Sequence, residues 1–246
     1  MANESIQTRT KKETAPLRTD KRRPRKSRIE QSELIRGRLF KAAADVVGKV
    51  GYAAASIALI TQKAGVAQGT FYNYFESRQD LLDRLLPALG DQMLAHVRKC
   101  ALGGHNFAEL EERSFQGFFS YLRETPAFLR ILNEGENYAP VGYKRYFETL
   151  TKGYVKFLQR SLRNGEFPAY GEGELEAIAF ILISARSYLP VRFAGKNGKN
   201  GKNGKGDKGD RDLPIWLVKT YMKFVRYGLQ GAPAVKSRGG RAANNK

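Results

Sequence analysis

The chain has little of the chemistry on which many enzymes and secreted proteins depend. Its 246 residues include one cysteine, Cys100, which excludes internal disulfides and cysteine-based zinc clusters. The only histidines are His96 and His105, and no Ser/His/Asp or Cys/His set is visible. The Gly-Lys pairs lack the Ser or Thr that follows the lysine of a phosphate-binding loop. We therefore expect no enzyme activity, no catalytic residue, no metal site and no cofactor.

Long hydrophobic runs are also missing. No stretch reaches the roughly 18 apolar residues that span a bilayer. The first 26 residues lack the apolar segment of a secretory signal. With 41% hydrophobic residues, the chain still has enough apolar side chains for one or two compact domains. These features predict a cytoplasmic protein that has no membrane partner.

Acidic residues are scarce relative to basic ones. The 43 Lys and Arg against 24 Asp and Glu give a net charge of +19, which favours a polyanionic partner such as nucleic acid. Most of this charge lies in three segments, residues 1–31, 195–212 and 231–246, which carry +6, +3 and +4. We predict a disordered basic arm, a flexible Lys/Gly-rich insertion and a disordered basic tail, because these segments have almost no apolar groups to bury. They either aid solubility or add salt-sensitive attraction to DNA.

The remaining chain shows helical periodicity only, with no alternating strand pattern. The first amphipathic helix is expected from Ser32 to Gly51, and short helices follow it. Ser77 is expected to cap a long fourth helix. The pattern predicts an all-α protein, with a three-helix DNA-binding domain at residues 32–76 and a helical regulatory and dimerisation domain at residues 77–230.

The stretch from Ser56 to Leu82, SIALITQKAGVAQGTFYNYFESRQDLL, predicts a helix-turn-helix. Ala64 and Gly65 permit a tight turn between its helices, and Phe71 and Phe75 are assigned to the core. The polar and small residues suit a major groove, where Gln and Asn can pair with adenine, while tyrosine and arginine suit phosphates. The candidate DNA-binding residues are Ser56, Gln68, Gly69, Thr70, Tyr72, Asn73, Tyr74 and Arg78.

The segment AGVAQGTFYNYF at residues 64–75, followed by Ser77-Arg78 and Leu81-Leu82, resembles the signature of the TetR/AcrR family of regulators. Two positions depart from the family pattern: Ala67 stands where serine is frequent, and Arg78 stands where lysine is usual. The resemblance implies a homodimer whose interface uses the last two long helices, here about residues 174–192 and 213–229. It also implies a helical domain that binds a small molecule.

The aromatic helices of the second domain suggest an apolar pocket, although such stripes also suit an ordinary core. The candidate ligand-binding residues are Phe118, Phe119, Tyr143, Phe147 and Arg186. Arg186 lies among apolar residues, where an unpaired charge is costly. It is expected either to bind a ligand carboxylate or phosphate, or to pair with Glu174 or Glu176 across a dimer interface.

Together these features predict a ligand-responsive transcriptional regulator. We expect a repressor that binds a palindromic operator in double-stranded DNA as a homodimer, and that a small amphipathic or aromatic effector releases. The alternative is a nucleoid-associated or architectural DNA-binding protein without a small-molecule ligand. Competition with bulk DNA distinguishes them, because only the regulator should prefer one site strongly.

Overall fold

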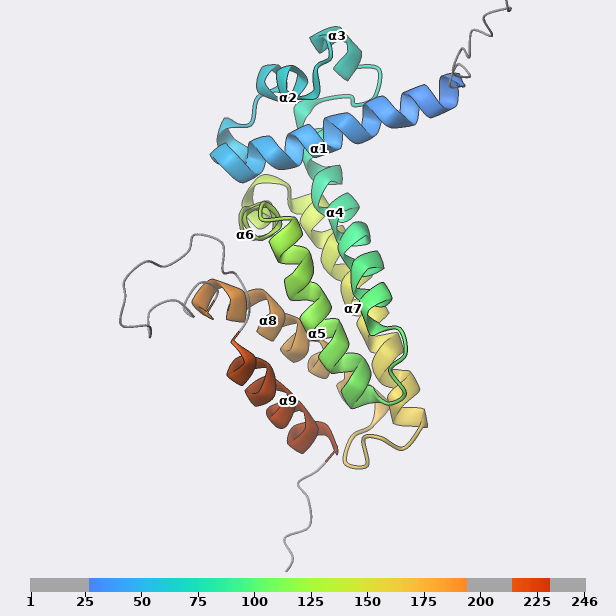
Figure 1. The fold of residues 1–246 in the computed structure, drawn as a ribbon. Helices are drawn as coiled ribbons and strands as arrows, with labels where there is room; N and C mark the ends of the chain where they lie inside the picture. The colour runs from blue at the N-terminus through green and yellow to red at the C-terminus, as the bar shows by residue number, and fades with distance from the viewer. Residues whose placement is uncertain (1–26, 194–213, 231–246) are drawn as a thin grey trace, which may run out of the picture.

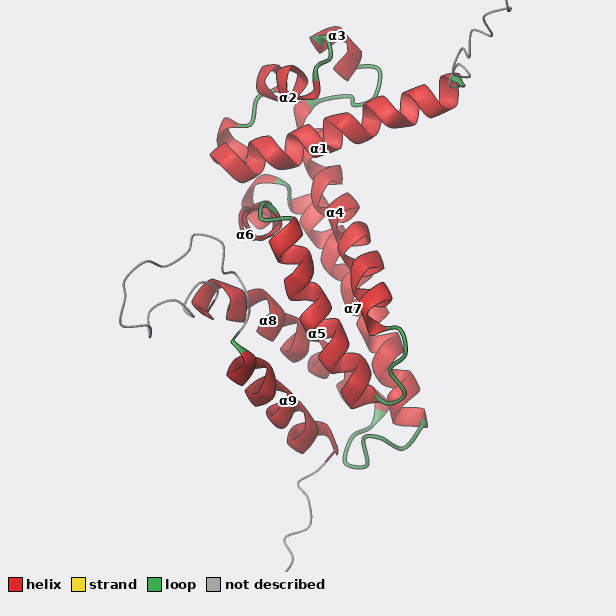
Figure 2. Ribbon diagram, in the orientation of Figure 1, coloured by secondary structure: helices red, strands yellow, loops and turns green. Residues whose placement is uncertain are grey.

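The computed structural model describes residues 27–193 and 214–230, and these contain helices and loops but no strand (Figure 2). The helices are α1 (Arg28–Ala54), α2 (Ile57–Ala64), α3 (Gln68–Phe71), α4 (Arg78–Ala101), α5 (Phe107–Glu124), α6 (Phe128–Tyr138), α7 (Pro140–Arg163), α8 (Leu175–Phe193) and α9 (Ile215–Gln230), with a 3₁₀ turn at Glu172–Glu174. The expected all-α class is confirmed. Nearly all of the predicted arm, and the predicted insertion and tail, lie outside the described residues.

The helices form two parts (Figure 1). Helices α1, α2 and α3 lie together at one end, and α1 crosses the end of a bundle that contains α4, α5 and α7. Helix α4 leaves the first part and runs along the second, while α8 and α9 lie against the side of the bundle, away from α3. No described helix is long and apolar enough to cross a membrane.

The first helix begins earlier than the sequence pattern predicts. The Ser27 hydroxyl accepts a hydrogen bond from Glu30 N–H at 3.2 Å, and the Glu30 carboxylate accepts one from Ser27 N–H at 2.9 Å. This capping box stabilises a helix start at Arg28 rather than Ser32. The prediction of a disordered segment through residue 31 is therefore wrong for its last four residues, because periodicity ignores a polar cap.

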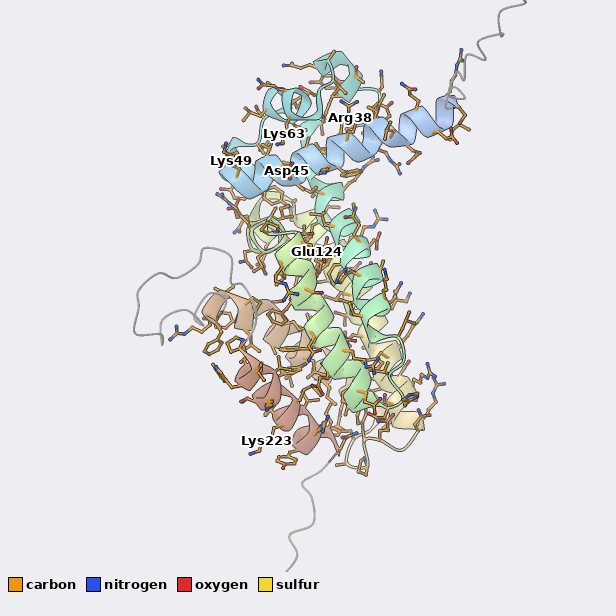
Figure 3. All side chains as sticks on the ribbon, in the orientation of Figure 1. Arg38, Asp45, Lys49, Lys63, Glu124 and Lys223 are labelled. Atoms are coloured by element: carbon orange, nitrogen blue, oxygen red, sulfur yellow. The ribbon has the colours of Figure 1, made fainter. Side chains whose placement is uncertain are left out.

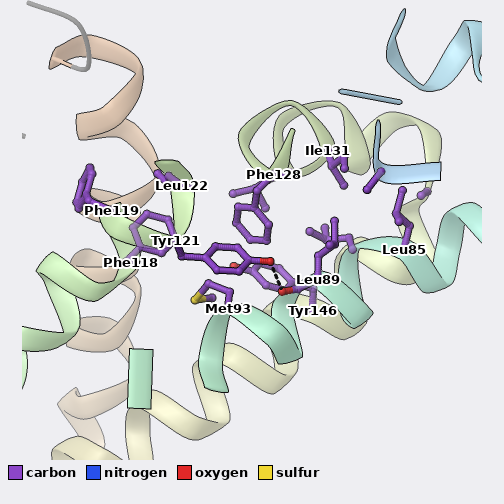
Figure 4. Packing of buried hydrophobic residues seen from close by; sticks show 14 of the residues in the cluster. Leu85, Leu89, Met93, Phe118, Phe119, Tyr121, Leu122, Phe128, Ile131 and Tyr146 are labelled. Atoms are coloured by element: carbon purple, nitrogen blue, oxygen red, sulfur yellow. Dashed lines mark hydrogen bonds between the residues drawn. The ribbon is translucent and has the colours of Figure 1, made fainter. Parts of the chain in front are cut away.

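A continuous apolar core joins the two parts of the molecule. Leu81, Leu82 and Leu85 at the start of α4 are fully buried, as is Phe71 in α3. Farther along, Leu89 and Met93 of α4 pack in one cluster with Tyr121, Phe128 and Tyr146 from α5, α6 and α7, as the close view shows (Figure 4). Because α4 supplies residues to both ends of this core, a displacement of α4 would change the packing at both ends.

Candidate DNA-binding face and ligand cavity

The turn between α2 and α3 has the geometry that the sequence predicts. The Ser56 hydroxyl caps α2 by accepting a hydrogen bond from Leu59 N–H at 3.2 Å. Gly65 ends the helix with φ 65° and ψ 43°, a left-handed conformation that only glycine adopts at little cost. The chain therefore reverses within a few residues, which brings α3 against α2.

Contacts from α1 hold this turn in place (Figure 3). The Arg38 guanidinium donates hydrogen bonds to the carbonyl oxygens of Ala64 and Gly65 at the carboxyl end of α2. Lys63 of α2 forms an ion pair with Asp45 of α1 at 3.7 Å. Because the last carbonyls of a helix have no partner within it, a cation there stabilises the helix end. The sequence pattern gave no sign of the Arg38 contact, which spans 26 residues.

Helix α3 presents a polar surface and buries an aromatic one. Phe71 and Phe75 are buried, as expected. The predicted DNA-binding residues on the other side are exposed at Gln68, Gly69, Tyr72 and Asn73 and half-buried at Thr70 and Tyr74. A methyl group built on Gly69 would meet nothing within 4 Å, which leaves the backbone there open to an approaching surface.

The recognition segment is short. Regular α3 geometry ends at Phe71, and a turn follows in which the N–H groups of Asn73 and Tyr74 bind the carbonyls of Thr70 and Phe71 at 3.2 and 3.0 Å. The preceding residue, Ala67, occupies the N-cap position without a side-chain hydrogen bond. Helix α3 therefore lacks a side-chain cap at the position where serine is frequent in the family that the sequence resembles.

Two predicted DNA-binding residues have structural contacts of their own. Ser56 caps α2, and the Arg78 guanidinium donates to carbonyl oxygens at the end of α1, with Nε at 2.6 Å from that of Ala55 and Nη2 bonded to that of Tyr52. Arg78 thus ties the start of α4 to the end of α1. A phosphate contact by Ser56 or Arg78 stays a prediction.

Helix α6 also forms hydrogen bonds with the carboxyl end of α1. Regular geometry in α1 breaks at Gly51, where φ is 83°, and this confirms the expected helix stop. The Arg130 guanidinium donates to Lys49 O at 3.0 Å, while the Glu134 carboxylate accepts from Tyr52 N–H at 2.9 Å and from Arg130 Nε at 2.7 Å. Desolvation opposes ionisation of Glu134, but hydrogen bonds from Arg130 and Tyr52 outweigh it and lower the pKa of this carboxyl.

A cavity of about 310 Å³ lies among α4, α5, α7 and α8. Of the predicted ligand-binding residues, Phe118 and Arg186 line it. Phe119 instead lines a groove beside α9, and Tyr143 and Phe147 line another groove over α7 and α8. The structure thus brings together two of the five residues. The other lining residues are Met93, Leu94, Val97, Arg98, Ala101, Leu110, Glu111, Ser114, Tyr146, Leu150, Gly153, Tyr154, Phe157, Arg160, Ile183 and Ser187.

Arg186 belongs to a buried polar cluster. Its Nη2 donates to Glu111 Oε1 at 2.8 Å, and its Nη1 contacts the Tyr154 hydroxyl. The hydroxyls of Tyr154 and Tyr221 both donate to the Glu111 carboxylate. Burial acts to lower the pKa of Arg186, but the facing Glu111 carboxylate outweighs it and raises that pKa. The expected pairing with Glu174 or Glu176 is not what the described protomer contains: the partner of Arg186 is Glu111, 75 residues away.

The exposed polar face of α3, the left-handed turn at Gly65 and the helix across the end of the bundle form a helix-turn-helix, a motif that many DNA-binding proteins use. A family model described as "Bacterial regulatory proteins, tetR family" matches residues 39–85. This range contains the carboxyl-terminal part of α1, all of α2 and α3, and the start of α4. Over these residues the chain is similar to that family of transcriptional regulators.

Relatives agree with this assignment. The uncharacterized HTH-type transcriptional regulator YvdT of Bacillus subtilis is 42% identical over 60 residues, which is 24% of this chain and 29% of that protein. The HTH-type transcriptional regulator BetI of Vibrio campbellii is 32% identical over 72 residues, or 29% and 36% of the two chains. These matches therefore span about a third of each relative.

The fold extends the likeness beyond the DNA-binding domain. The solved structure of the fatty acid degradation regulator FadR from Bacillus halodurans covers 79% of this chain and 99% of its own, with 18% identity and a TM-score of 0.60. At this level of identity the likeness concerns the fold alone, so the arrangement of the helices is shared over the matched residues.

Proposed function

We propose that this chain is a ligand-responsive repressor that binds a palindromic operator as a homodimer and leaves it when a small amphipathic or aromatic molecule enters the cavity. The observation that carries the proposal is that α4 links the exposed polar face of α3 to a largely apolar cavity. The start of α4 packs in one core with Phe71 of α3, and later residues of α4 line the cavity. A nucleoid-associated protein without a ligand would have no use for such a cavity, so the structure favours the regulator over that alternative.

A homodimer is supported by apolar side chains on the outer faces of α8 and α9. Exposed apolar surface of this extent is typical of a subunit interface. A second copy of the chain is the occupant we propose, since two recognition segments are needed to read two halves of a palindrome. The exposed apolar residues are Phe180, Ile181, Tyr188, Val191, Ile215, Trp216, Phe224 and Tyr227.

Packed side chains connect the cavity to the helices that support the α3 surface. Met93 and Tyr146 line the cavity and also belong to the cluster that contains Leu89 and Phe128. The Tyr121 hydroxyl donates to Leu89 O at 3.1 Å, which ties α5 to α4 in this cluster (Figure 4). Phe128 lies on α6, which holds the end of α1 through Arg130 and Glu134. Ligand binding would therefore shift α4 and α6, and with them the separation of the two recognition segments.

Selection of genomic fragments by the purified full-length protein tests this function. We expect one palindromic sequence to be enriched and to bind about a thousandfold or more tightly than random DNA in competition. Equal affinity for all fragments would instead support the nucleoid-associated alternative. The adjacent genes would point to the effector.

A further inference from the structure

The residues that line the cavity are apolar at one end and basic at the other. At one end its walls are the buried side chains of Met93, Phe118 and Tyr146. At the other end they include Arg98 in the last turn of α4 and Arg160 in the last turn of α7, both exposed. Helices α4 and α7 end at the same end of the bundle (Figure 1). The cavity therefore has an apolar interior and a cationic opening.

The charges at the opening differ from the charge inside. Arg186 is paired with Glu111, whose carboxylate also accepts hydrogen bonds from Tyr154 and Tyr221. This buried pair is electrically neutral, and a ligand anion there would compete with Glu111. Arg98 and Arg160 form no ion pair with a described residue. The uncompensated positive charge of the cavity is therefore at its opening.

Gly153 shows where the cavity meets solvent. It lines the cavity, is exposed, and lies in the interior of α7, where glycine is unfavourable relative to alanine. A methyl group built on Gly153 would meet no atom within 4 Å, so no close packing requires glycine there. Arg160 follows seven residues later on the same face of the helix, about 10 Å along its axis. A missing side chain at position 153 keeps the space beside the opening clear.

We infer that the effector is an elongated amphiphile whose apolar body extends toward Met93 and Tyr146 and whose anionic head lies at Arg98 and Arg160. This inference rests on the proposed function and deepens it, because it names the class and orientation of the effector. A carboxylate and a phosphate ester are both suitable heads, since both accept charged hydrogen bonds from arginine. Arg186 does not bind the head in this inference, because it is already paired with Glu111.

Calorimetry on the full-length protein tests the inference with three single-chain probes of equal length: decanoate, 1-decanol and decyltrimethylammonium. We expect decanoate to bind about tenfold more tightly than 1-decanol, and the cation to bind most weakly. Raising the salt concentration should weaken the binding of decanoate and leave the binding of 1-decanol unchanged, because salt screens exposed charges. Decyl phosphate identifies the head: stronger binding than decanoate points to a phosphate ester, and equal binding points to a carboxylate.

Two variants locate the bound molecule. The double substitution Arg98→Gln and Arg160→Gln should remove the advantage of decanoate over 1-decanol, whereas Arg145→Gln, an exposed arginine of α7 that does not line the cavity, should keep it. Gly153→Trp should weaken decanoate and 1-decanol alike by about tenfold or more. Gly153→Ala is the matched control and should bind both.

The results separate this inference from the proposed function. Equal binding of decanoate and 1-decanol by the wild type would contradict the inference that the effector has an anionic head. An apolar effector would then remain the proposal. Undiminished binding by folded Gly153→Trp, or no binding of any probe by the wild type, would overturn the assignment of this cavity to amphiphiles. The fragment selection does not depend on the probes, so a DNA-binding failure would be recognised separately.

Discussion

The DNA-binding face and the cavity place their side chains by different means. The face takes its residues from one short stretch, 56–78, and leaves most of them exposed. The cavity takes its residues from four helices between residues 93 and 187 and buries a charged cluster in its wall. Local geometry therefore builds the first site, whereas long-range packing builds the second. Substitutions of exposed side chains without structural contacts, such as Asn73, should change binding at constant stability, whereas substitutions in the buried cluster should change stability first.

The largest effect is expected from the buried cluster. Arg186→Met leaves the Glu111 carboxylate buried without its cation, and we expect the free energy of unfolding to fall by about 3–5 kcal/mol. Adding Glu111→Leu should restore a substantial part, because the uncompensated charge is removed. Urea unfolding at one fixed protein concentration measures both variants. A single variant as stable as the wild type would mean that Glu111 is not held by Arg186.

The second effect concerns the exposed face. Asn73→Ala removes a side chain that we expect to pair with a base edge, which should weaken operator binding by about 1–3 kcal/mol. Its stability should stay within about 0.5 kcal/mol of the wild type, because the side chain is exposed. Gel-shift titrations against the selected operator provide the measurement. Asn137→Ala, an exposed asparagine of α6, should bind normally, and equal losses in both variants would contradict a specific role for Asn73.

The contrast between the two regions also explains what the sequence could and could not reveal. The turn at Gly65, the burial of Phe71 and the exposure of Asn73 follow from residues a few positions apart, so the periodicity and the turn residues predict them. The apolar neighbours of Arg186 in the sequence indicate a costly charge, but they do not identify its partner Glu111, which lies 75 residues away. Sequence spacing carries no information on which buried groups a fold brings together.

Arginine shows the same limit around the DNA-binding face. Arg38, Arg78 and Arg130 all donate to carbonyl oxygens at helix ends. The sequence suggested a phosphate contact for Arg78 and no role for the other two, because capping from another helix leaves no local pattern. Part of the positive charge in the described residues thus stabilises the carboxyl ends of helices.

The third prediction uses the uncapped start of α3. Ala67→Ser should supply the missing side-chain acceptor and raise the free energy of unfolding by about 1 kcal/mol. Denaturant unfolding detects a gain of this size, and Ala54→Ser, at the carboxyl end of α1, is the control that should not stabilise. A destabilised Ala67→Ser protein would mean that the N-cap geometry at position 67 does not accept a serine cap.

The smallest effect is expected at the junction of the two regions. Glu134→Gln keeps an acceptor for Tyr52 N–H but removes the charge that faces Arg130, so we expect a loss of about 0.5 kcal/mol at neutral pH. Because the pKa of Glu134 is lowered in the folded protein, its contribution is complete above the ordinary glutamate pKa of about 4.3 and is lost as the pH falls through the lowered value.

Unfolding as a function of pH checks this sign. The difference between wild type and Glu134→Gln should disappear in acid, while Glu136→Gln, an exposed glutamate on the same helix, should show no difference at neutral pH. A difference that grows as the pH falls would contradict the contact between α6 and α1.

The central claim is that filling the cavity changes how the α3 surface binds DNA. Its most direct test is the operator affinity of the full-length protein with and without saturating decanoate, with cavity occupancy followed by calorimetry in the same buffer. We expect the affinity to fall by about 5- to 150-fold, the range of ordinary coupling between two sites. An operator affinity that stays constant while the cavity is filled would contradict the account.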